Sequence, residues 1–372
     1  MAVLIFSMPG DLHTAAVEWS LRRKGVEIDK VYMPDFPQRG SISCEVNSSD
    51  VNFLVGDRKI RYKDYDTVWF RRFSSAVPSG LLAQGDLTAA KRSWIELSRF
   101  LIEFPRGNAF CLNPPESQAM RDNKVFQLGV ARDCGLLIPL TLVGTNHEDL
   151  AAFITTNSRD GHETIVKPLV PTMWSRSDGT KVTLAVSIVT LGDLEEADVS
   201  SEPLIYQRRV QKAYEVRLTV MGQMMFAVKL ESQAHPDSQL DFRNAKDWRV
   251  LGHELIVIPN DIRVKIRRFC DRLQTPFGTM DFIVTIDDDW VFLESNTMGN
   301  FLWMEDCNPQ IPLLDCFTEF LCSKDPMFKY VPETNGSLCR FSEFQADREF
   351  MLAFEKDDIQ HVRYEFPFIV ED

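Results

Sequence analysis

Short apolar runs and helical repeats alternate along the first part of the chain. Residues 3–7 (VLIFS) and 26–32 (VEIDKVY) have the apolar content of buried strands, and residues 12–24 between them repeat apolar positions with helical spacing. Gly25 follows that repeat at the usual place of a C-terminal cap. A strand–helix–strand order of this kind predicts a parallel sheet with helices on its faces.

A further strand and a long helix follow in the pattern. Residues 64–73 (DYDTVWFRRF) predict a strand that ends in Arg71 and Arg72, and residues 87–103 repeat apolar positions as a helix does. Two prolines in the stretch CLNPPESQAMRDNK then interrupt regular structure. We therefore place the first domain boundary near residue 113.

The rest of the chain predicts a mixture of strands and helices. Helices are expected at 121–134, 261–273, 315–322 and 342–355; strands at 164–169, 203–210, 215–222 and 224–232; and a hairpin at 278–296. The chain ends in a further apolar stretch, YEFPFIV.

Composition excludes several classes of protein. The 372 residues are 44% hydrophobic, which is enough for two or three packed domains. A net charge of −13 disfavours a nucleic-acid partner bound by bulk electrostatics. Eight cysteines without a C-x-x-C pair favour free thiols in a reducing cytosol. The N-terminal apolar run lacks a basic start and no long apolar window occurs, so we expect a cytoplasmic protein without a membrane partner.

Polar residues interrupt the predicted hairpin at selected places. Glu294 and Asn296 share a face of the second strand, because side chains alternate with period two. Asp281 on the first strand joins them only if the turn has an even number of residues or a strand carries a bulge. Two carboxylates and an amide oxygen would then suit Mg²⁺. The alternative is a solvent-facing polar stripe on an antiparallel hairpin.

Several basic residues stand in or beside apolar strands. Lys167 lies within the strand TIVKPL, where a buried ammonium group needs an anionic partner: a nucleotide phosphate or a carboxylate of the protein. Lys124 lies on a predicted helix, Arg217 within a strand, and Arg243 after the apolar pair in LDFR. Guanidinium groups suit phosphate or carboxylate, although each of them could also form an ordinary ion pair.

Familiar nucleotide motifs and nucleophiles are missing from the sequence. There is no G-x-x-x-x-G-K-[ST] loop and no G-x-G-x-x-G after the first strand. No cysteine or serine has a histidine in a recognisable context. Lysine, arginine and Mg²⁺ would therefore act on phosphate electrostatically, without a covalent intermediate on the protein.

The order of these features resembles that of the ATP-grasp enzymes, and within them the microviridin-type peptide ligases, or graspetide synthetases. Four stretches carry the narrower resemblance, which covers roughly residues 1–322. They are TVWFRR (67–72), YQRRVQKAYEVRLTVMG (206–222), ESQAHPDSQLDFR (231–243) and ESNTMGNFLWMED (294–306).

The resemblance implies a fold and a division into domains. The fold would be of mixed α/β and α+β class: an ATP-grasp fold with an N-terminal βαβ (pre-ATP-grasp) domain. The expected parts are residues 1–113, the N-terminal domain; 114–205, the central ATP-grasp subdomain; 206–322, the C-terminal subdomain; and 323–372, an extension of unknown role.

The resemblance also implies a reaction. With ATP and Mg²⁺, such enzymes phosphorylate an Asp or Glu side chain of a ribosomally made precursor peptide, and a Ser, Thr or Lys side chain of the same peptide then attacks the acylphosphate. The product is a macrocyclic ester or amide. A precursor peptide with leader and core would be the partner, and a homodimer is compatible with the family. The alternatives are another ATP-grasp ligase that adds amino acids to a peptide or protein, an ATP-grasp kinase, and a silent peptide-binding module.

Family roles transfer to this chain residue by residue. The resemblance implies phosphate contacts for Lys124 and Lys167, and an adenine contact for Gln207 with backbone help near Arg208 and Val210. It implies a ribose contact for Glu215 and charge stabilisation by Arg217 and Arg243. The implied Mg²⁺ ligands are Asp281, Glu294 and Asn296. Gly299 would allow close approach near the reacting carboxylate, and residues 192–198 (GDLEEAD) would meet basic residues of the leader. At the hinge, Gln207 is followed by Arg208 where the family has an acidic residue.

Overall fold

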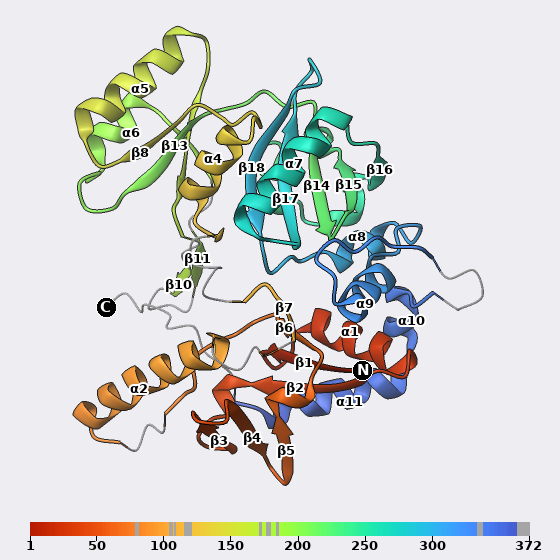
Figure 1. The fold of residues 1–372 in the computed structure, drawn as a ribbon. Helices are drawn as coiled ribbons and strands as arrows, with labels where there is room; N and C mark the ends of the chain where they lie inside the picture. The colour runs from red at the N-terminus through yellow and green to blue at the C-terminus, as the bar shows by residue number, and fades with distance from the viewer. Residues whose placement is uncertain are drawn as a thin grey trace.

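Three β-sheets with helices on their faces form most of the computed structural model (Figure 1). The structure describes residues 1–78, 82–103, 107, 109–114, 121–170, 173–175, 180–183, 186–332 and 338–362.

The first sheet is parallel and contains the N-terminus. Its strand order is β2 (Glu27–Tyr32), β1 (Ala2–Ser7), β6 (Thr67–Phe70) and β7 (Phe110–Leu112). Helix α1 (Leu12–Arg23) joins β1 to β2 and begins at Asp11, whose carboxylate accepts a hydrogen bond from the backbone N–H of Thr14. The predicted strand–helix–strand opening is thus confirmed.

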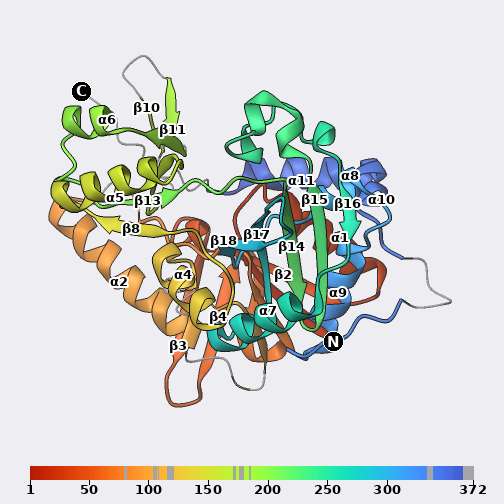
Figure 2. The ribbon, with the colours of Figure 1, turned by 90° about the horizontal axis from the view of Figure 1, so that it is seen from above.

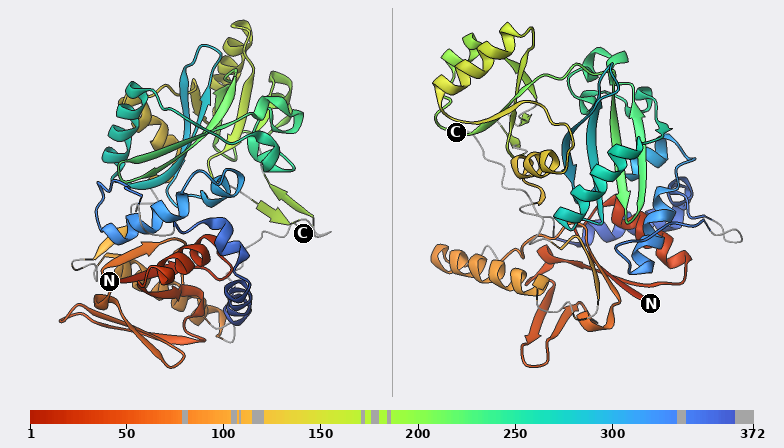
Figure 3. Two further views of the ribbon diagram at one scale, coloured as in Figure 1. Left: turned by 90° about the vertical axis from the view of Figure 1, so that its right-hand side faces the viewer. Right: turned by 45° about the horizontal axis from the view of Figure 1, so that its top comes forward.

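An antiparallel meander that the sequence analysis missed follows the first sheet. Its strands are β3 (Gly40–Glu45), β4 (Asp50–Val55) and β5 (Arg58–Arg61). Phe53 on β4 packs against Phe6 of β1 with ring centroids 5.7 Å apart, so the meander covers one face of the first sheet. The long helix α2 (Gln84–Glu103) projects outward from the same part of the molecule (Figure 3).

The second sheet is antiparallel and has four strands. Their order is β12 (Ser187–Val189), β9 (Thr164–Pro168), β13 (Leu204–Arg208) and β8 (Thr141–Gly144). Helices α5 (His147–Arg159) and α6 (Leu191–Glu196) cover it through Leu150, Ile154 and Leu194, which pack with Tyr206. A separate two-stranded ladder joins β10 (Met173–Ser175) to β11 (Lys181–Thr183).

The third sheet is antiparallel and has five strands. Their order is β16 (Glu254–Ile256), β15 (Met224–Leu230), β14 (Tyr214–Met221), β17 (Phe277–Val284) and β18 (Trp290–Asn296). Helices α4 (Lys124–Asp133) and α7 (Asn260–Leu273) share one core with this sheet. On α7, Ile262, Ile266, Phe269 and Leu273 recur with the helical period and are buried. Seen from above, the second and third sheets lie on opposite sides of the molecule (Figure 2).

The C-terminal helices connect the third sheet with the first. Helices α8 (Leu302–Cys307), α9 (Leu313–Ser323) and α10 (Phe341–Ala346) belong to a core that also contains Val3 and Ile5 of β1 and Phe277 of β17. The helix predicted at 342–355 is two helices, because α10 ends at Ala346 and the carboxylate of Asp347 caps α11 (Arg348–Gln360) by accepting from the N–H of Phe350. The apolar stretch 364–370 lies outside the described residues. Of the helices described, none is both long and apolar enough to cross a membrane.

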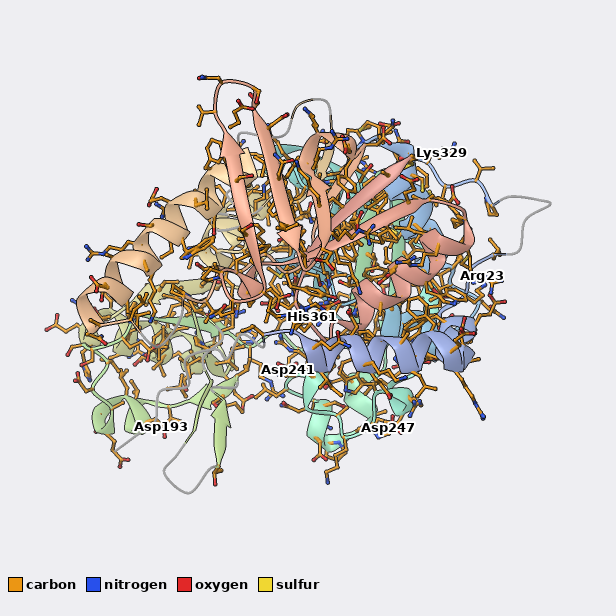
Figure 4. The ribbon with its side chains drawn as sticks, turned by 90° about the horizontal axis from the view of Figure 1, so that it is seen from below. Arg23, Asp193, Asp241, Asp247, Lys329 and His361 are labelled. Carbon is orange, nitrogen blue, oxygen red and sulfur yellow. The ribbon has the colours of Figure 1, made fainter. Side chains whose placement is uncertain are left out.

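His361 fastens the end of α11 to the first sheet (Figure 4). Its Nδ1 lies 2.6 Å from a carboxylate oxygen of Asp35, and its Nε2 lies 3.0 Å from Asp357. Lys30 of β2 also contacts Asp357, at 2.9 Å. Burial acts to lower the pKa of His361, but the hydrogen bonds to Asp35 and Asp357 outweigh it and raise the pKa to about 9.

This contact predicts a pH-dependent contribution to stability. Because the folded-state pKa of about 9 exceeds the ordinary value of 6.5, the contribution is complete below pH 6.5 and is lost as the pH rises through 9. We expect His361→Gln to lower the free energy of unfolding by about 2 kcal/mol at pH 6. Urea titrations of both proteins should show this difference shrinking between pH 6.5 and 9 and absent at pH 10. An equal difference at pH 6 and pH 10 would contradict the ion-pair assignment.

Candidate active site

A cavity of about 310 Å³ lies between the second and third sheets. Strands β9 and β13 contribute residues from one side, β14, β17 and β18 from the other, and the segment 240–244 closes one end. Its lining falls into two kinds of residue. The charged and polar ones are Lys124, Lys167, Gln207, Glu215, Asp241, Arg243, Asn244, Asp281 and Glu294; the apolar ones are Ile165, Pro168, Val186, Leu240, Phe242, Ile283 and Leu293.

A β-bulge brings the two carboxylates of the hairpin together. Val284 pairs with Trp290 across the turn and Phe282 pairs with Phe292, but the register then shifts so that Asp281 pairs with Glu294. Leu293 is the extra residue of the bulged strand. The turn between Val284 and Trp290 has an odd number of residues, which alone would place Asp281 and Glu294 on opposite faces of the hairpin. The bulge shifts the register by one residue and places both side chains on the same face. The predicted requirement for an even turn or a bulge is met by the bulge.

Glu294 is the acceptor on which several cations converge. Its carboxylate lies 3.6 Å from Nζ of Lys124 and 3.2 Å from Nη1 of Arg243. Burial acts to raise the pKa of this carboxyl, but Arg243 and Lys124 outweigh it and hold the pKa below its ordinary value. Glu294 is therefore an anion that the surrounding cations stabilise.

Lys167 faces the same cavity from β9. It forms no ion pair within 4.0 Å with any residue that the structure describes, although most buried ammonium groups have one. Burial lowers its pKa to about 8, and Lys124 and Arg243 add to this effect while Glu294 opposes it. An anion entering the cavity would relieve the unfavourable burial of this charge.

Asp281 is paired with Arg217 across β14 and β17. Nη1 of Arg217 donates to Oδ1 of Asp281 over 2.6 Å, and Nη2 reaches the carbonyl of Asn300 at 3.5 Å. Burial raises the pKa of Asp281 in spite of Arg217, and the negative charge of Glu294 adds to the rise. Two buried carboxylates side by side are electrostatically unfavourable, and a divalent cation would relieve this. The donor chemistry of Asp281 and Glu294 fits Mg²⁺.

Asn296 holds a turn in this structure. It shares the face of Glu294, and its Oδ1 accepts from the N–H groups of Met298 and Gly299 at 3.0 Å each. Asn296 does not line the cavity as Asp281 and Glu294 do. The structure thus brings the two carboxylates of the predicted metal set to the cavity and uses the amide to shape the loop beyond β18.

Of the predicted nucleotide contacts, Gln207 and Glu215 line the cavity. The side chain of Gln207 donates to Oγ1 of Thr141 over 2.9 Å, and Glu215 accepts from Nζ of Lys212 over 2.7 Å. Arg208 turns away: its Nε donates to Asn157 on α5, and its backbone N–H donates to the carbonyl of Leu140. Neither Arg208 nor Val210 belongs to the cavity lining.

Gly299 belongs to the loop that follows β18, and Arg71 contacts this loop from the N-terminal layer. Gly299 has a φ of +52°, and a Cβ there would lie 3.0 Å from the ring of Phe277. The position of Gly299 is therefore close to the protein's own core, and the predicted approach near a reacting carboxylate stays a prediction. Arg71 is buried and donates to the carbonyl of Gly299 and to Oδ1 of Asn300.

The acidic segment 192–198 begins within α6, far along the chain from these residues.

The apolar lining and the residue that clamps β18 were not among the predicted site residues. Ile165 stands two residues from Lys167, and Ile283 two from Asp281, so period-two alternation could have identified them. Gln127 on α4 is fully buried; its Oε1 accepts from the N–H of Ser295 over 2.8 Å, and its Nε2 donates to the carbonyl of Ser295 over 2.7 Å. No local pattern in the sequence marks this tertiary contact.

The double hydrogen bond of Gln127 makes this residue the link between α4 and β18. Lys124 precedes it by one helical turn and Glu294 precedes Ser295, so the clamp sets the Lys124–Glu294 separation. Gln127→Met would leave two buried backbone groups unpaired, and we expect a loss of about 2–4 kcal/mol in the free energy of unfolding.

Nucleotide affinity measured on folded Gln127→Met shows whether Gln127 positions Lys124 and Glu294 or only stabilises the fold. At a temperature where Gln127→Met remains folded, we expect its affinity for Mg²⁺-ADP to fall about tenfold, because both Lys124 and Glu294 move. Gln38→Met is the matched control, since the Gln38 amide bonds the carbonyl of Val77 on the surface of the first layer. An unchanged affinity in folded Gln127→Met would show that the clamp serves stability alone.

Comparison with known proteins finds solved structures that share this architecture. No family model matches the chain, and no curated protein sequence does. Among solved structures, an ATP-grasp ligase from Chryseobacterium gregarium associated with a ribosomally synthesised, modified peptide, in complex with ADP and a leader and core peptide, is 24% identical with a TM-score of 0.79. The match covers 87% of this chain and 97% of that one.

Two further solved structures are similar over the same part of the chain. The macrocyclase MdnC from Microcystis aeruginosa, bound with its precursor peptide MdnA, is 24% identical, with 87% of this chain and 100% of that chain covered and a TM-score of 0.75. The D-cycloserine synthetase DcsG is 12% identical, with 87% and 99% covered and a TM-score of 0.53. At these identities the likeness establishes the architecture, and the prediction of an ATP-grasp fold of mixed α/β and α+β class is confirmed.

Proposed function

We propose that the chain is an ATP-dependent peptide ligase of the graspetide type. It would join Asp or Glu side chains of a ribosomally made precursor peptide to Ser, Thr or Lys side chains of the same peptide, as macrocyclic esters or amides. The observation that carries the proposal is the cavity between two sheets, where Lys124 and Arg243 contact the carboxylate of Glu294 and Lys167 has no ion pair among the described residues. Structural similarity to two ligases solved with their peptides supports the choice of substrate class.

The cavity has the components of a nucleotide site. Lys124 and Lys167 would hold phosphate oxygens, because both ammonium groups lie in the lining and Lys167 has no ion pair of its own among the described residues. The apolar side chains beside them suit a base, with Gln207 supplying hydrogen bonds and Glu215 a ribose contact. ATP, when bound, supplies the phosphoryl group that activates a carboxylate.

Charge near the reacting groups would be handled by two carboxylates and two arginines. Asp281 and Glu294 would hold Mg²⁺, with Asn296 as the third ligand once its turn contacts rearrange. Arg217 and Arg243 each contact one of these carboxylates, so their guanidinium groups stand where negative charge develops during phosphoryl transfer. This arrangement needs no nucleophile from the protein.

The proposed division of the chain follows the sheets. We infer boundaries near residues 113, 205 and 322, between the N-terminal domain, the two ATP-grasp subdomains and the C-terminal extension. The described part of that extension packs on α1 and β2 through α10, α11 and His361. It would therefore serve as a packing arm for the N-terminal domain.

The reaction predicts a change in the mass of the peptide. Incubation of a co-encoded precursor peptide with the protein, ATP and Mg²⁺ should remove the mass of one water molecule per ring, measured by mass spectrometry. The double variant Glu294→Gln, Asn296→Ala should yield no product and no ADP while retaining its circular dichroism spectrum. A gain of an amino-acid residue would replace the proposal by terminal ligation, and a gain of a phosphate by a kinase.

The pKa of Lys167 predicts how nucleotide affinity depends on pH. With a pKa lowered to about 8 in the free protein, Lys167 is charged below pH 8, and a bound phosphate would raise that pKa again. Binding therefore takes up a proton above pH 8, and we expect the affinity for Mg²⁺-ADP to fall there with a limiting slope of about tenfold per pH unit. Calorimetric titrations from pH 7 to 9.5 test this, with Lys167→Arg expected to remove the slope. Equal slopes in both proteins would contradict the phosphate contact.

A further inference from the structure

A second cavity lies on the other side of the loop that follows β18. The β1–α1 connection contributes Asp11, the start of α1 contributes His13, and Arg72 follows β6. The other lining residues include Trp248, Asn300 and Trp303. None of these residues was assigned a role in nucleotide binding. The cavity therefore needs an explanation of its own.

The loop 296–301 separates the two cavities and contacts groups on both sides. From the first cavity, Nη2 of Arg217 reaches the carbonyl of Asn300 at 3.5 Å. From the N-terminal layer, Nη2 of Arg71 donates to Oδ1 of Asn300 over 2.7 Å. The second cavity is thus one residue away from the pair of Arg217 and Asp281. A substrate that spans both cavities would pass the proposed reaction centre.

Two guanidinium groups and one carboxylate meet beside the second cavity, and Arg72, but not Arg71, belongs to its lining. The carboxylate of Asp11 accepts from Nε of Arg71 at 3.3 Å and from Nε of Arg72 at 2.6 Å, so one anion faces two guanidinium groups. Arg71 is buried and uses its Nη atoms on loop oxygens. Arg72 is 38% exposed, and its Nη atoms have no partner among the residues that the structure describes.

His13 contributes a neutral donor to the same cavity. Its Nε2 accepts from the N–H of Phe301 at 3.1 Å and from that of Leu302 at 3.3 Å, which places the ring proton on Nδ1. Burial lowers the pKa of His13 to about 3, and Arg71 adds to that effect, so the ring stays neutral at physiological pH. His13 thus offers an N–H group and does not accept a proton.

Two indole rings form the apolar wall of the cavity. Trp248 and Trp303 meet edge to face with ring centroids 5.0 Å apart, and Nε1 of Trp303 donates to the carbonyl of Asn300. An apolar wall beside a guanidinium group whose Nη atoms have no partner among the described residues suits a carboxylate on a short aliphatic side chain.

We propose that the second cavity is a carboxylate-binding subsite, in which Arg72 holds an acidic side chain of the peptide while another side chain reacts at the first cavity. This inference rests on the proposed peptide substrate. It assigns the Arg72 guanidinium a role in substrate recognition, and it implies that a peptide with one acidic side chain binds less well than a peptide with two.

Fluorine NMR of the full chain labelled with 5-fluorotryptophan tests the subsite. The signals of Trp248 and Trp303 are identified with Trp248→Phe and Trp303→Phe. N-acetylaspartate N′-methylamide is the probe, and the corresponding asparagine compound is its neutral counterpart. We expect saturable shifts of both signals with the aspartate probe at about millimolar concentration, and at least about tenfold weaker binding of the asparagine probe.

Variants then locate the binding group. Arg72→Met should weaken the aspartate probe about tenfold, and Arg72→Lys should restore part of the affinity because the charge remains. Arg132→Met is the matched control, since Arg132 is exposed on α4 and pairs with Asp133. Equal binding of both probes, or shifts that survive in folded Arg72→Met, would overturn the proposal. If Arg72→Met does not fold, the comparison of the two probes on the unsubstituted protein decides.

The probe experiment is independent of ring formation. Carboxylate binding without any ATP-dependent loss of water from a peptide would refute the proposed function while leaving the subsite in place. Ring formation together with equal binding of the two probes would refute the subsite alone.

Discussion

Burial of the Asp281–Glu294 pair is the constraint on which the candidate site depends. Two adjacent carboxylates in a low-dielectric cavity repel each other, so the surrounding sequence must supply positive charge. Arg217 contacts one carboxylate, and Lys124 and Arg243 contact the other. Arg243 also pairs with Asp241 at 2.8 Å, so Lys167 is the lysine of the lining that has no ion pair among the described residues, and its charge would favour an anion in the cavity.

Backbone geometry makes that electrostatic arrangement possible. Without the bulge at Leu293, Asp281 would lie opposite a residue of the other face and the carboxylates would point to different sides of the sheet. The outer edge of β18 is then fastened by Gln127 and by the N–H of Phe292, which donates to the carbonyl of Leu137. At this edge, α4 and the loop that contains Leu137 supply hydrogen bonds that a neighbouring strand would otherwise make, and they fix the position of β18.

The loop beyond β18 connects the chemistry of the third sheet to the first. Asn296 shapes its start, and Arg71 of the N-terminal layer binds its middle. This loop packs on one hydrophobic core, which contains residues of β1, β17 and the C-terminal helices. Arg71 and Arg217 both contact Asn300, so a movement of the N-terminal layer would shift Asn300 and alter its contact with Arg217.

Sequence pattern alone determined the elements with a clear period and the face of the hairpin that carries the carboxylates. It identified β1, α1, β9, β14, β17 and β18, and it stated that the site required a bulge or an even turn. It did not identify the division at Asp347 or the meander after β2, although the side chains of β3 and β4 alternate in burial along each strand. Only tertiary structure decided which cations meet Glu294, that Gln127 completes the edge of β18, that Arg208 faces α5, and that Gly299 packs on Phe277. The physical reason is that alternation is set by neighbours along the chain, whereas ion pairs and buried hydrogen bonds join residues that are distant in sequence, and no local pattern records them.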